Sequence, residues 1–510
     1  MTAQFLKRAT VHLTPISPVH VGCGEVYEPT QFAVEDGILY AFDPTVVPLT
    51  SLLRSDLLRA AKTGKLVDLA SFFNKNAKLF IPASRAAFLV DASISKNYRV
   101  MVNDKNGRGR NEIFRTAFVR RGEDDDPYIP GSSVKGAVHT ALVDRIHQGK
   151  PVRDSDRFDC DREVLGAESF SDSPMRFLKV GDFMPTGAVP RRAAIARRIH
   201  KGAKTPDADG RVGHGAVPCA LEVIDGGSYR AFRSEWCIWD DPKHGVRHRY
   251  GDFEQIVRDL NRKSMISLRK EIGELKASGR ADAWVKAISS LLTAIRPEMD
   301  MGRVALVRIG KNQGAEALTL SGGIARIRIA RGPNRGKTKP TADTQFFLTQ
   351  GEEIVPFGWC LLEWGDAVLP ALRDWCGRQR KSTIVDLQPV RAAQREAREA
   401  AIREKAELQR RREAEAAQQK AEAERLSSMS EEAREVDAIA NELRRTPDSV
   451  KPGSELFGKV MALLERAGGW NVDEQRACAN VLGPLIKKKD MYQGKFIKEI
   501  KARLRALRNE

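Results

Sequence analysis

The chain has 510 residues, too many for one compact domain, and this length predicts roughly two to four structural units. Its 85 Lys and Arg against 67 Asp and Glu give a formal net charge of +18, which favours a polyanionic partner without separating RNA, DNA and an anionic membrane. No apolar run approaches membrane-spanning length and no signal-peptide pattern opens the chain, so no membrane partner is expected. The seven cysteines are scattered and never form a Cys-x-x-Cys pair. This pattern predicts reduced thiols, a cytoplasmic location, and neither a metal site nor a cofactor.

The first predicted elements are strands, because apolar and polar side chains alternate between residues 9 and 42. Asp36 and Gly37 fit the two-residue turn of a hairpin within this region. Gly22 and Gly24 leave room for a ligand to approach the backbone closely, and glycines so near a hairpin also serve turns. Both interpretations of the two glycines stay open.

Residues 50–90 carry apolar side chains at helical spacing, which indicates packed helices. The stretch 97–112 is basic and rich in Asn and Gly, so it is predicted to be a loop. Arg108 and Arg110 are candidate phosphate contacts in this loop, although a merely solvated loop has the same composition. The acidic run 123–126 that follows is typical of a solvated turn.

The most informative segment covers residues 128–142. An extended stretch ends at Pro130, and apolar residues then recur at helical spacing, which predicts a buried helix with an exposed N-terminus. Unpaired N–H groups, the helix dipole, two hydroxyls and one lysine suit an anion such as a phosphate there. The candidate contacts are Gly131, Ser132, Ser133, Lys135 and Gly136. The lysine precedes the last glycine, which excludes a P-loop, whereas an ordinary capped helix has the same local pattern.

Residues 184–218 are basic and follow no hydrophobic period, which predicts a long excursion between strands. Its guanidinium groups would bind phosphates, and Ile195 or Ile199 would wedge between unstacked bases. A basic surface loop is the alternative. The candidate contacts in this excursion are Arg191, Arg192, Arg197, Arg198 and Lys201.

Helical spacing returns at residues 252–294, where helices are expected to cover a sheet. A strand at 305–309 then enters a glycine-rich loop whose candidate phosphate contacts are Arg308, Gly310, Lys311 and Gly314. Trp359 and Trp364 lie in an apolar strand, which favours core packing over stacking on bases.

The composition changes in the tail. Residues 391–425 hold ten Lys and Arg and eight Glu, which predicts a long, exposed, charge-interleaved helix. A compact helical unit is expected at 431–510, and residues 482–510 contain nine Lys and Arg against three acids. Two hypotheses fit this unit: it adds RNA affinity, or it docks a neighbouring subunit.

The run Ile-Pro-Gly-Ser-Ser-Val-Lys-Gly at residues 129–136 resembles the signature of the RAMP superfamily, the RNA-binding subunits of CRISPR effector complexes. Residues 13–24, 308–314 and 356–359 resemble further motifs of these proteins. Taken in order, the motifs are most similar to those of the terminal capping subunits of type III-A, or Csm, effectors. The resemblance covers roughly residues 9–370 and does not include the tail.

The resemblance implies an α+β fold of ferredoxin-like, RNA-recognition-type lobes with a glycine-rich loop and a thumb hairpin, followed here by an all-α extension. The expected domains are residues 1–183, an N-terminal lobe; 184–380, the excursion, helical insert and second lobe; 381–430, a charged linker; and 431–510, a helical domain. The implied function is non-catalytic binding of guide RNA, with capping of its 3′ side and contact with the guide–target duplex. The implied partners are CRISPR guide RNA, complementary target RNA and other Csm subunits, above all the backbone RAMP subunit.

Two other functions stay open. RNA-cleaving relatives in type III complexes rely on an Asp in an early loop, where this chain offers Glu25 and Glu28 but no Asp. No catalytic residue is therefore predicted, and a RAMP-type endoribonuclease that processes or cleaves RNA is the alternative. A basic scaffold that binds duplex DNA through its tail is the third possibility.

Overall fold

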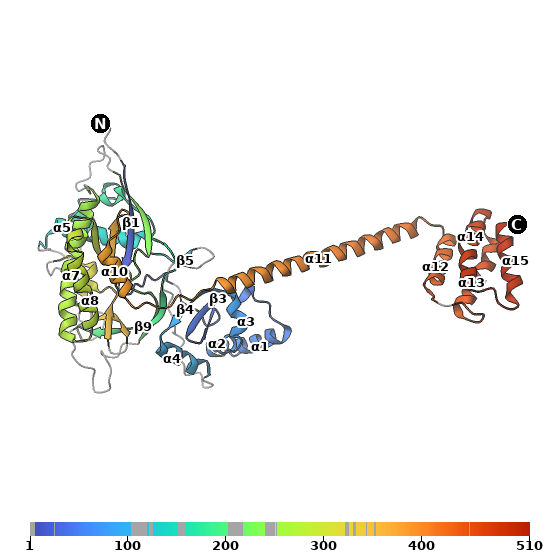
Figure 1. The fold of residues 1–510 in the computed structure, drawn as a ribbon, viewed down its shortest axis with the longest axis horizontal. Helices are drawn as coiled ribbons and strands as arrows, with labels where there is room; N and C mark the ends of the chain where they lie inside the picture. The colour runs from blue at the N-terminus through green and yellow to red at the C-terminus, as the bar shows by residue number, and fades with distance from the viewer. Residues whose placement is uncertain are drawn as a thin grey trace. The chain divides into compact units, whose positions relative to one another are not determined.

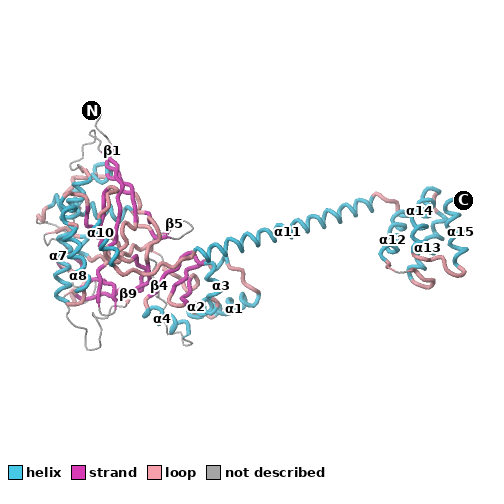
Figure 2. Tube along the Cα trace, viewed as in Figure 1, coloured by secondary structure: helices cyan, strands magenta, loops and turns pink. Residues whose placement is uncertain are grey.

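The structure, a computed structural model, describes residues 6–24, 26–103, 120–121, 126–150, 159–201, 218–239, 250, 252–321, 326–329, 333–342, 344–350, 353–447 and 449–509. Contacts divide the chain into two compact units, Met1–Arg395 and Glu396–Glu510. The first unit holds the sheets, and the second is helical (Figure 2). None of the described helices combines the length and the apolar character needed to cross a membrane.

The first sheet is antiparallel throughout and has β1 at its centre, between β11 and β17 (Figure 1). In β11, buried and more exposed residues alternate, as expected for a strand with one face toward the core. Every residue of β12 is buried, which fits a strand covered on both faces. In the order β12-β17-β1-β11-β7, with β8 beside β11, the strands are β1 (Leu6–Pro15), β7 (Leu178–Val180), β8 (Met184–Pro185), β11 (Phe232–Trp239), β12 (Val304–Arg308) and β17 (Trp359–Trp364).

The second sheet runs β16-β15-β9-β4-β3-β2, and β10 also pairs with β9. Only β4 and β9 are parallel among its described pairs. Its strands are β2 (Phe32–Glu35), β3 (Ile38–Phe42), β4 (Ser84–Val90), β9 (Arg191–His200), β10 (Cys219–Ile224), β15 (Thr344–Gln350) and β16 (Glu353–Pro356). Two small pairs join β5 (Arg120–Arg121) to β6 (Asp126–Pro127) and β13 (Ile327–Arg328) to β14 (Thr338–Lys339).

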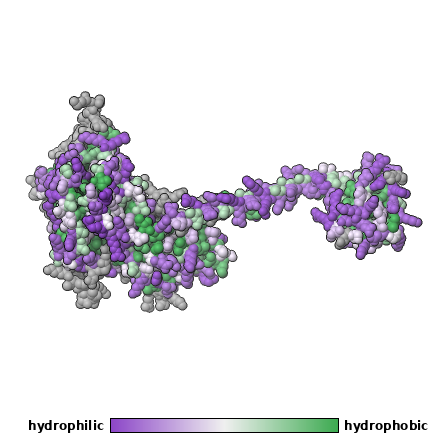
Figure 3. All heavy atoms as spheres, viewed as in Figure 1, coloured by the Kyte–Doolittle hydropathy of each residue, from purple (hydrophilic) through white to green (hydrophobic). Residues whose placement is uncertain are grey.

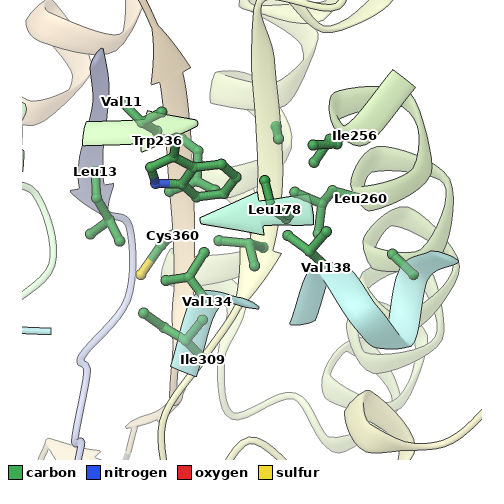
Figure 4. Packing of buried hydrophobic residues seen from close by; sticks show 14 of the residues in the cluster. Val11, Leu13, Val134, Val138, Leu178, Trp236, Ile256, Leu260, Ile309 and Cys360 are labelled. Atoms are coloured by element: carbon green, nitrogen blue, oxygen red, sulfur yellow. The ribbon is translucent and has the colours of Figure 1, made fainter. Parts of the chain in front are cut away.

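The helices of the first unit cover these sheets. The buried helix α5 packs against α7, and α7 also contacts α8 (Figure 1). Val134 and Val138 of α5 enter the main core beside Leu178 of β7 and Leu260 of α7 (Figure 4). The helices are α1 (Ser51–Lys62), α2 (Leu66–Lys75), α3 (Ala77–Phe80), α4 (Ala92–Asn103), α5 (Gly131–His147), α6 (Cys160–Glu163), α7 (Phe253–Ser278), α8 (Asp282–Ala294), α9 (Arg296–Asp300) and α10 (Pro370–Arg378).

The second unit begins within α11 (Gln388–Ser427), a helix of 40 residues. Oppositely charged side chains pair along it one turn apart, such as Arg403 with Glu399. The four helices that follow bury one hydrophobic core of their own. They are α12 (Glu431–Arg445), α13 (Glu455–Arg466), α14 (Val472–Lys488) and α15 (Phe496–Arg508). The predicted fold class, α+β lobes of ferredoxin-like type followed by an all-α extension, is confirmed.

Three expectations need correction. Residues 84–90, expected to be helical, form β4, and residues 97–103, expected to belong to a loop, lie in α4. Residues 191–200 were predicted to lie in an irregular excursion, but they form β9, an inner strand. The side chains that β9 buries are mostly alanines, whose small apolar surface gave no visible period. Ile199 is 3% exposed in the core, so it does not wedge between bases. Strands β9 and β10 do form a hairpin, and its intervening residues 202–217 lie outside the described part of the chain.

The finer division of the first unit stays a prediction. Both sheets take strands from either side of residue 183, so each sheet is assembled from distant parts of the sequence.

Candidate nucleic-acid interface

The two predicted glycine-rich loops lie against each other. The backbone N–H of Lys311 donates to the carbonyl oxygen of His20 at 2.8 Å. Gly310 has a φ of +85°, and a Cβ on it would stand 2.5 Å from the same oxygen, so this position requires glycine. A Cβ on Gly22 would meet the end of the Lys311 side chain at 2.6 Å. The fold therefore places the exposed Lys311 directly over the backbone of the N-terminal loop.

A buried polar cluster lies beneath this pair of loops. Glu222 accepts a hydrogen bond from Tyr27 Oη at 2.7 Å and forms an ion pair with Arg191 at 3.2 Å. The backbone oxygen of Glu222 lies 2.9 Å from Nδ1 of His20. Burial lowers the pKa of His20 below its ordinary value, which favours the neutral ring. The cluster holds the loop from below through satisfied polar contacts, as buried polar groups require.

The other two loop glycines, Gly314 and Gly24, differ from each other in what surrounds them. Gly314 has a φ of +82°, and an added Cβ would lie 2.7 Å from Oε1 of Gln345, so the residue again serves close packing. Gly24 has a φ of +91° with nothing within 4 Å of an added Cβ. Gly24 is exposed, so a side chain would have space there, and only the positive φ favours glycine at this position.

The predicted anion seat is the start of α5. The backbone N–H of Gly131 donates to Oδ1 of Asp182 at 2.9 Å, so one of the free amides already has a carboxylate partner. A Cβ on Gly131 would stand 2.5 Å from the carbonyl oxygens of both Val180 and Gly181. This glycine is therefore needed for the close approach of α5 to β7. Gly136 has open space instead.

A pair of lysines distinguishes this helix start from an ordinary cap. Burial lowers the pKa of Lys135, and the positive charge of Lys179 on β7 lowers it further. Lys179 is exposed, Lys135 is half-buried, and Ser132 is exposed one turn before Lys135. Neither lysine makes an ion pair among the described residues. Two unpaired cations beside a helix N-terminus form a setting that favours an anion.

The four arginines of β9 divide into two pairs. Arg191 and Arg192 are held internally, since Arg192 bonds Asp91 and Asp225 at 3.0 Å each. Arg197 and Arg198 are exposed, and the Arg198 guanidinium lies 5.2 Å from the centre of the Phe346 ring. Only the second pair presents free charge to a ligand.

Two further predicted contacts are also engaged internally. Arg308 is buried, donates to Glu271 at 2.8 Å and lies 4.8 Å from the centre of the Trp359 ring. Lys201 forms ion pairs with Glu316 at 2.9 Å and Glu274 at 3.2 Å. These cations stabilise the packing of the first unit in the structure.

The remaining predictions fall partly beyond what the structure describes. Arg108 and Arg110 lie outside the described residues, as does Glu25 of the early loop. Glu28 is described and exposed. Across the described part of the chain, no group of three or more His, Cys, Asp or Glu side chains could hold a metal ion.

Sequence reasoning missed Lys179. The signal was present, because Lys179 alternates with the buried Leu178 in a short strand and so points away from the core. Its position next to α5 depends on the contact between α5 and β7, which the sequence does not reveal. Its partnership with Lys135 therefore required the fold.

Comparison with known proteins now identifies the family. The sequence model of the RAMP superfamily matches residues 12–380, more than half of the chain, and the chain therefore belongs to the RAMP superfamily. A chain in a cryo-EM structure of a Csm–crRNA–target RNA ternary complex of a type III-A CRISPR–Cas system is 15% identical, with a TM-score of 0.47; the match covers 70% of this chain and all of that one. Csm5 from T. onnurineus, a crystal structure, is 16% identical with a TM-score of 0.39, over 69% of this chain and 99% of that one. No curated protein matches the sequence.

Proposed function

We propose that this chain is a non-catalytic RNA-binding subunit of a type III-A CRISPR effector. It binds the guide RNA and caps its 3′ side, contacts the guide–target duplex, and stacks on the backbone RAMP subunit of a cytoplasmic complex. Membership of the RAMP superfamily supports this proposal, as does the order of the four motifs, which is similar to that of the capping subunits.

The observation that carries the RNA-binding part is the lysine pair at the start of α5. Burial lowers the pKa of Lys135 and the positive charge of Lys179 lowers it further, so the two ammonium groups repel each other in the free protein. A phosphate near both would relieve this repulsion, and the positive end of the α5 dipole, beside the exposed Ser132, adds favourable partial charge. The RNA backbone supplies such a phosphate.

The other proposed RNA contacts are cations whose side chains are exposed. Lys311 over the paired glycine loops, together with Arg197 and Arg198, offers exposed cations for further phosphates. The glycine-rich loops that carry or flank these cations are shaped by Gly22, Gly24, Gly310 and Gly314. For the internally paired cations Arg191, Arg192, Lys201 and Arg308, direct RNA contact stays a prediction.

Sequencing the nucleic acid that co-purifies with the chain tests this function. The chain is expressed with a CRISPR array and the other effector subunits, and the bound nucleic acid is recovered. Small RNAs that share repeat-derived sequence are expected. Random cellular RNA or duplex DNA would overturn the proposal.

A cleavage assay separates the proposal from the endoribonuclease alternative. The purified chain is incubated with labelled repeat RNA and labelled target RNA. Both RNAs should stay intact, because the proposed chemistry is phosphate neutralisation and backbone contact. Sequence-specific cuts that persist after repurification would establish the enzyme instead.

A further inference from the structure

The cations of the C-terminal unit differ in whether they have carboxylate partners. Two cations of α13 pair with carboxylates of α12: Arg466 pairs with Glu435, and Lys459 pairs with Glu442 at 3.1 Å. Hydrophilic residues dominate the face of this unit that is visible in Figure 3. Other exposed cations of this unit have no carboxylate partner among the described residues.

A row of four such cations lies along one side of α15. Ile500, Leu504 and Leu507 of this helix are buried in the core of the unit. With 3.6 residues per turn, the opposite, solvent-facing stripe carries Lys495, Lys498, Lys501 and Arg505, all exposed. Lys495 and Arg505 are ten residues apart, so the stripe is about 15 Å long.

None of these four cations has a carboxylate partner among the described residues. The one acidic residue of α15, Glu499, pairs with Arg503 at 2.9 Å. Like charges that follow one another at spacings of three and four residues destabilise a helix, whereas opposite charges at such spacings stabilise α11. Repulsion between the four cations therefore destabilises the helix, and a bound polyanion would relieve this repulsion.

Two aromatic rings flank the stripe. Lys501 Nζ lies 5.7 Å from the centre of the Tyr492 ring, and Lys495 Nζ lies 5.5 Å from that of Phe496. Both rings are half-buried, so each keeps part of its surface accessible. Cations beside aromatic rings are the combination that holds unpaired nucleic-acid strands, through phosphate contacts and base stacking.

We propose that the α15 stripe is a second RNA-binding surface, which takes single-stranded RNA through its phosphates without reading sequence. A protein partner fits less well, because four exposed cations occupy this surface and charged residues are depleted from the centres of protein–protein interfaces. A duplex would leave the two rings without a base to stack on. The surface lies outside residues 12–380, so it does not depend on the function proposed for the superfamily region.

The test uses the full chain and a matched control. The stripe variant replaces Lys495, Lys498, Lys501 and Arg505 with Gln. The control variant replaces four exposed cations of α11 with Gln, which changes the net charge equally: Arg395, Lys405, Arg410 and Arg412. Binding of a fluorescent oligouridine is measured between about 50 and 200 mM salt. The stripe variant should lower the salt slope by about 3, at about 0.7 for each single-strand phosphate, and the control should change it much less.

Ultraviolet crosslinking locates the contact independently. Labelled oligouridine should form adducts on the peptide that contains Tyr492 and Phe496. These adducts should disappear in the stripe variant, persist in the control, and persist when Lys135 is replaced with Ala. The last arm distinguishes failure of this surface from failure of the superfamily site.

Three results would overturn the proposal. The first is equal salt slopes and unchanged adducts in the stripe and control variants. The second is equally tight binding of duplex DNA with the same loss in the stripe variant, which would mean that the surface is a general polyanion site. The third is that the stripe variant fails to join the effector complex while its RNA binding is unchanged, which would make the stripe a protein-docking surface.

Discussion

Gly131 and Gly136 occupy the same motif and the same helix, yet the structure predicts opposite effects when each is replaced with Ala. A Cβ at Gly131 would stand 2.5 Å from two backbone carbonyl oxygens, so α5 and β7 must separate. Such overpacking costs about 1–3 kcal/mol. At Gly136 nothing lies within 4 Å of the added Cβ, and Ala in a helix interior gains about 0.5–1 kcal/mol over Gly. The two variants should differ in free energy of unfolding by about 1.5–4 kcal/mol.

Urea unfolding followed by tryptophan fluorescence measures this difference. Six of the seven tryptophans lie in the unit Met1–Arg395, and Trp236 belongs to the same core as Val134 and Val138 of α5. Gly131→Ala should lower the urea midpoint, and Gly136→Ala should leave it unchanged or raise it. If Gly131→Ala proves as stable as Gly136→Ala, the close approach of α5 to β7 is not what requires this glycine.

The remaining predictions concern charge and capping. Lys135→Ala and Lys179→Ala should each lower the salt slope of guide binding by about 0.7, whereas Lys286→Ala on α8 should not. Equal slopes for all three variants would mean that neither lysine contacts a phosphate. Burial and Lys179 lower the pKa of Lys135, so Lys135 should lose its charge at a lower pH than an ordinary lysine. The difference in RNA affinity between wild type and Lys135→Ala should therefore shrink as the pH rises, and RNA-binding titrations of both proteins across this pH range would measure it. Glu271→Ala should lower the free energy of unfolding, measured with a denaturant, by about 3–5 kcal/mol, because it leaves buried donors without an acceptor in Arg308, Gln345 and Trp359. A decrease below about 1 kcal/mol would contradict this. Ser454→Ala should weaken α13 by about 1 kcal/mol through loss of its N-cap, which hydrogen exchange of α13 amides would detect and unchanged protection would disprove.

Local signals in the sequence predicted several elements correctly. The hairpin turn is confirmed, since Asp36 and Gly37 both have positive φ between β2 and β3. Helix α5 begins at Gly131, directly after Pro130, as the extended-to-helical switch indicated. The core assignment of Trp359 is also confirmed, because its side chain is fully buried. In each case the information lies within a few residues of the element itself.

The wrong predictions concern elements whose structure depends on residues far away in the sequence. Strand β9 is stabilised by three neighbouring strands, and its buried alanines carry little signal in the sequence alone. The same limit applies to the interface. The sequence supplies the cations, but only the fold separates Arg191, paired with Glu222, from the exposed Arg197. Ion pairs between residues far apart in the chain leave no local pattern.

The central place of β1 has a consequence for biosynthesis. Val11 of β1 pairs with Trp364 of β17, so one edge of this strand has no partner until the ribosome has made almost the whole superfamily region. At roughly 5–20 residues per second, translation of that interval takes roughly 20–70 seconds. An unpaired strand edge recruits other strands, so the nascent chain is most prone to aggregate during this wait. Slow codons before Trp364 would prolong it, and a chaperone that covers the N-terminal strand would improve the yield of folded protein.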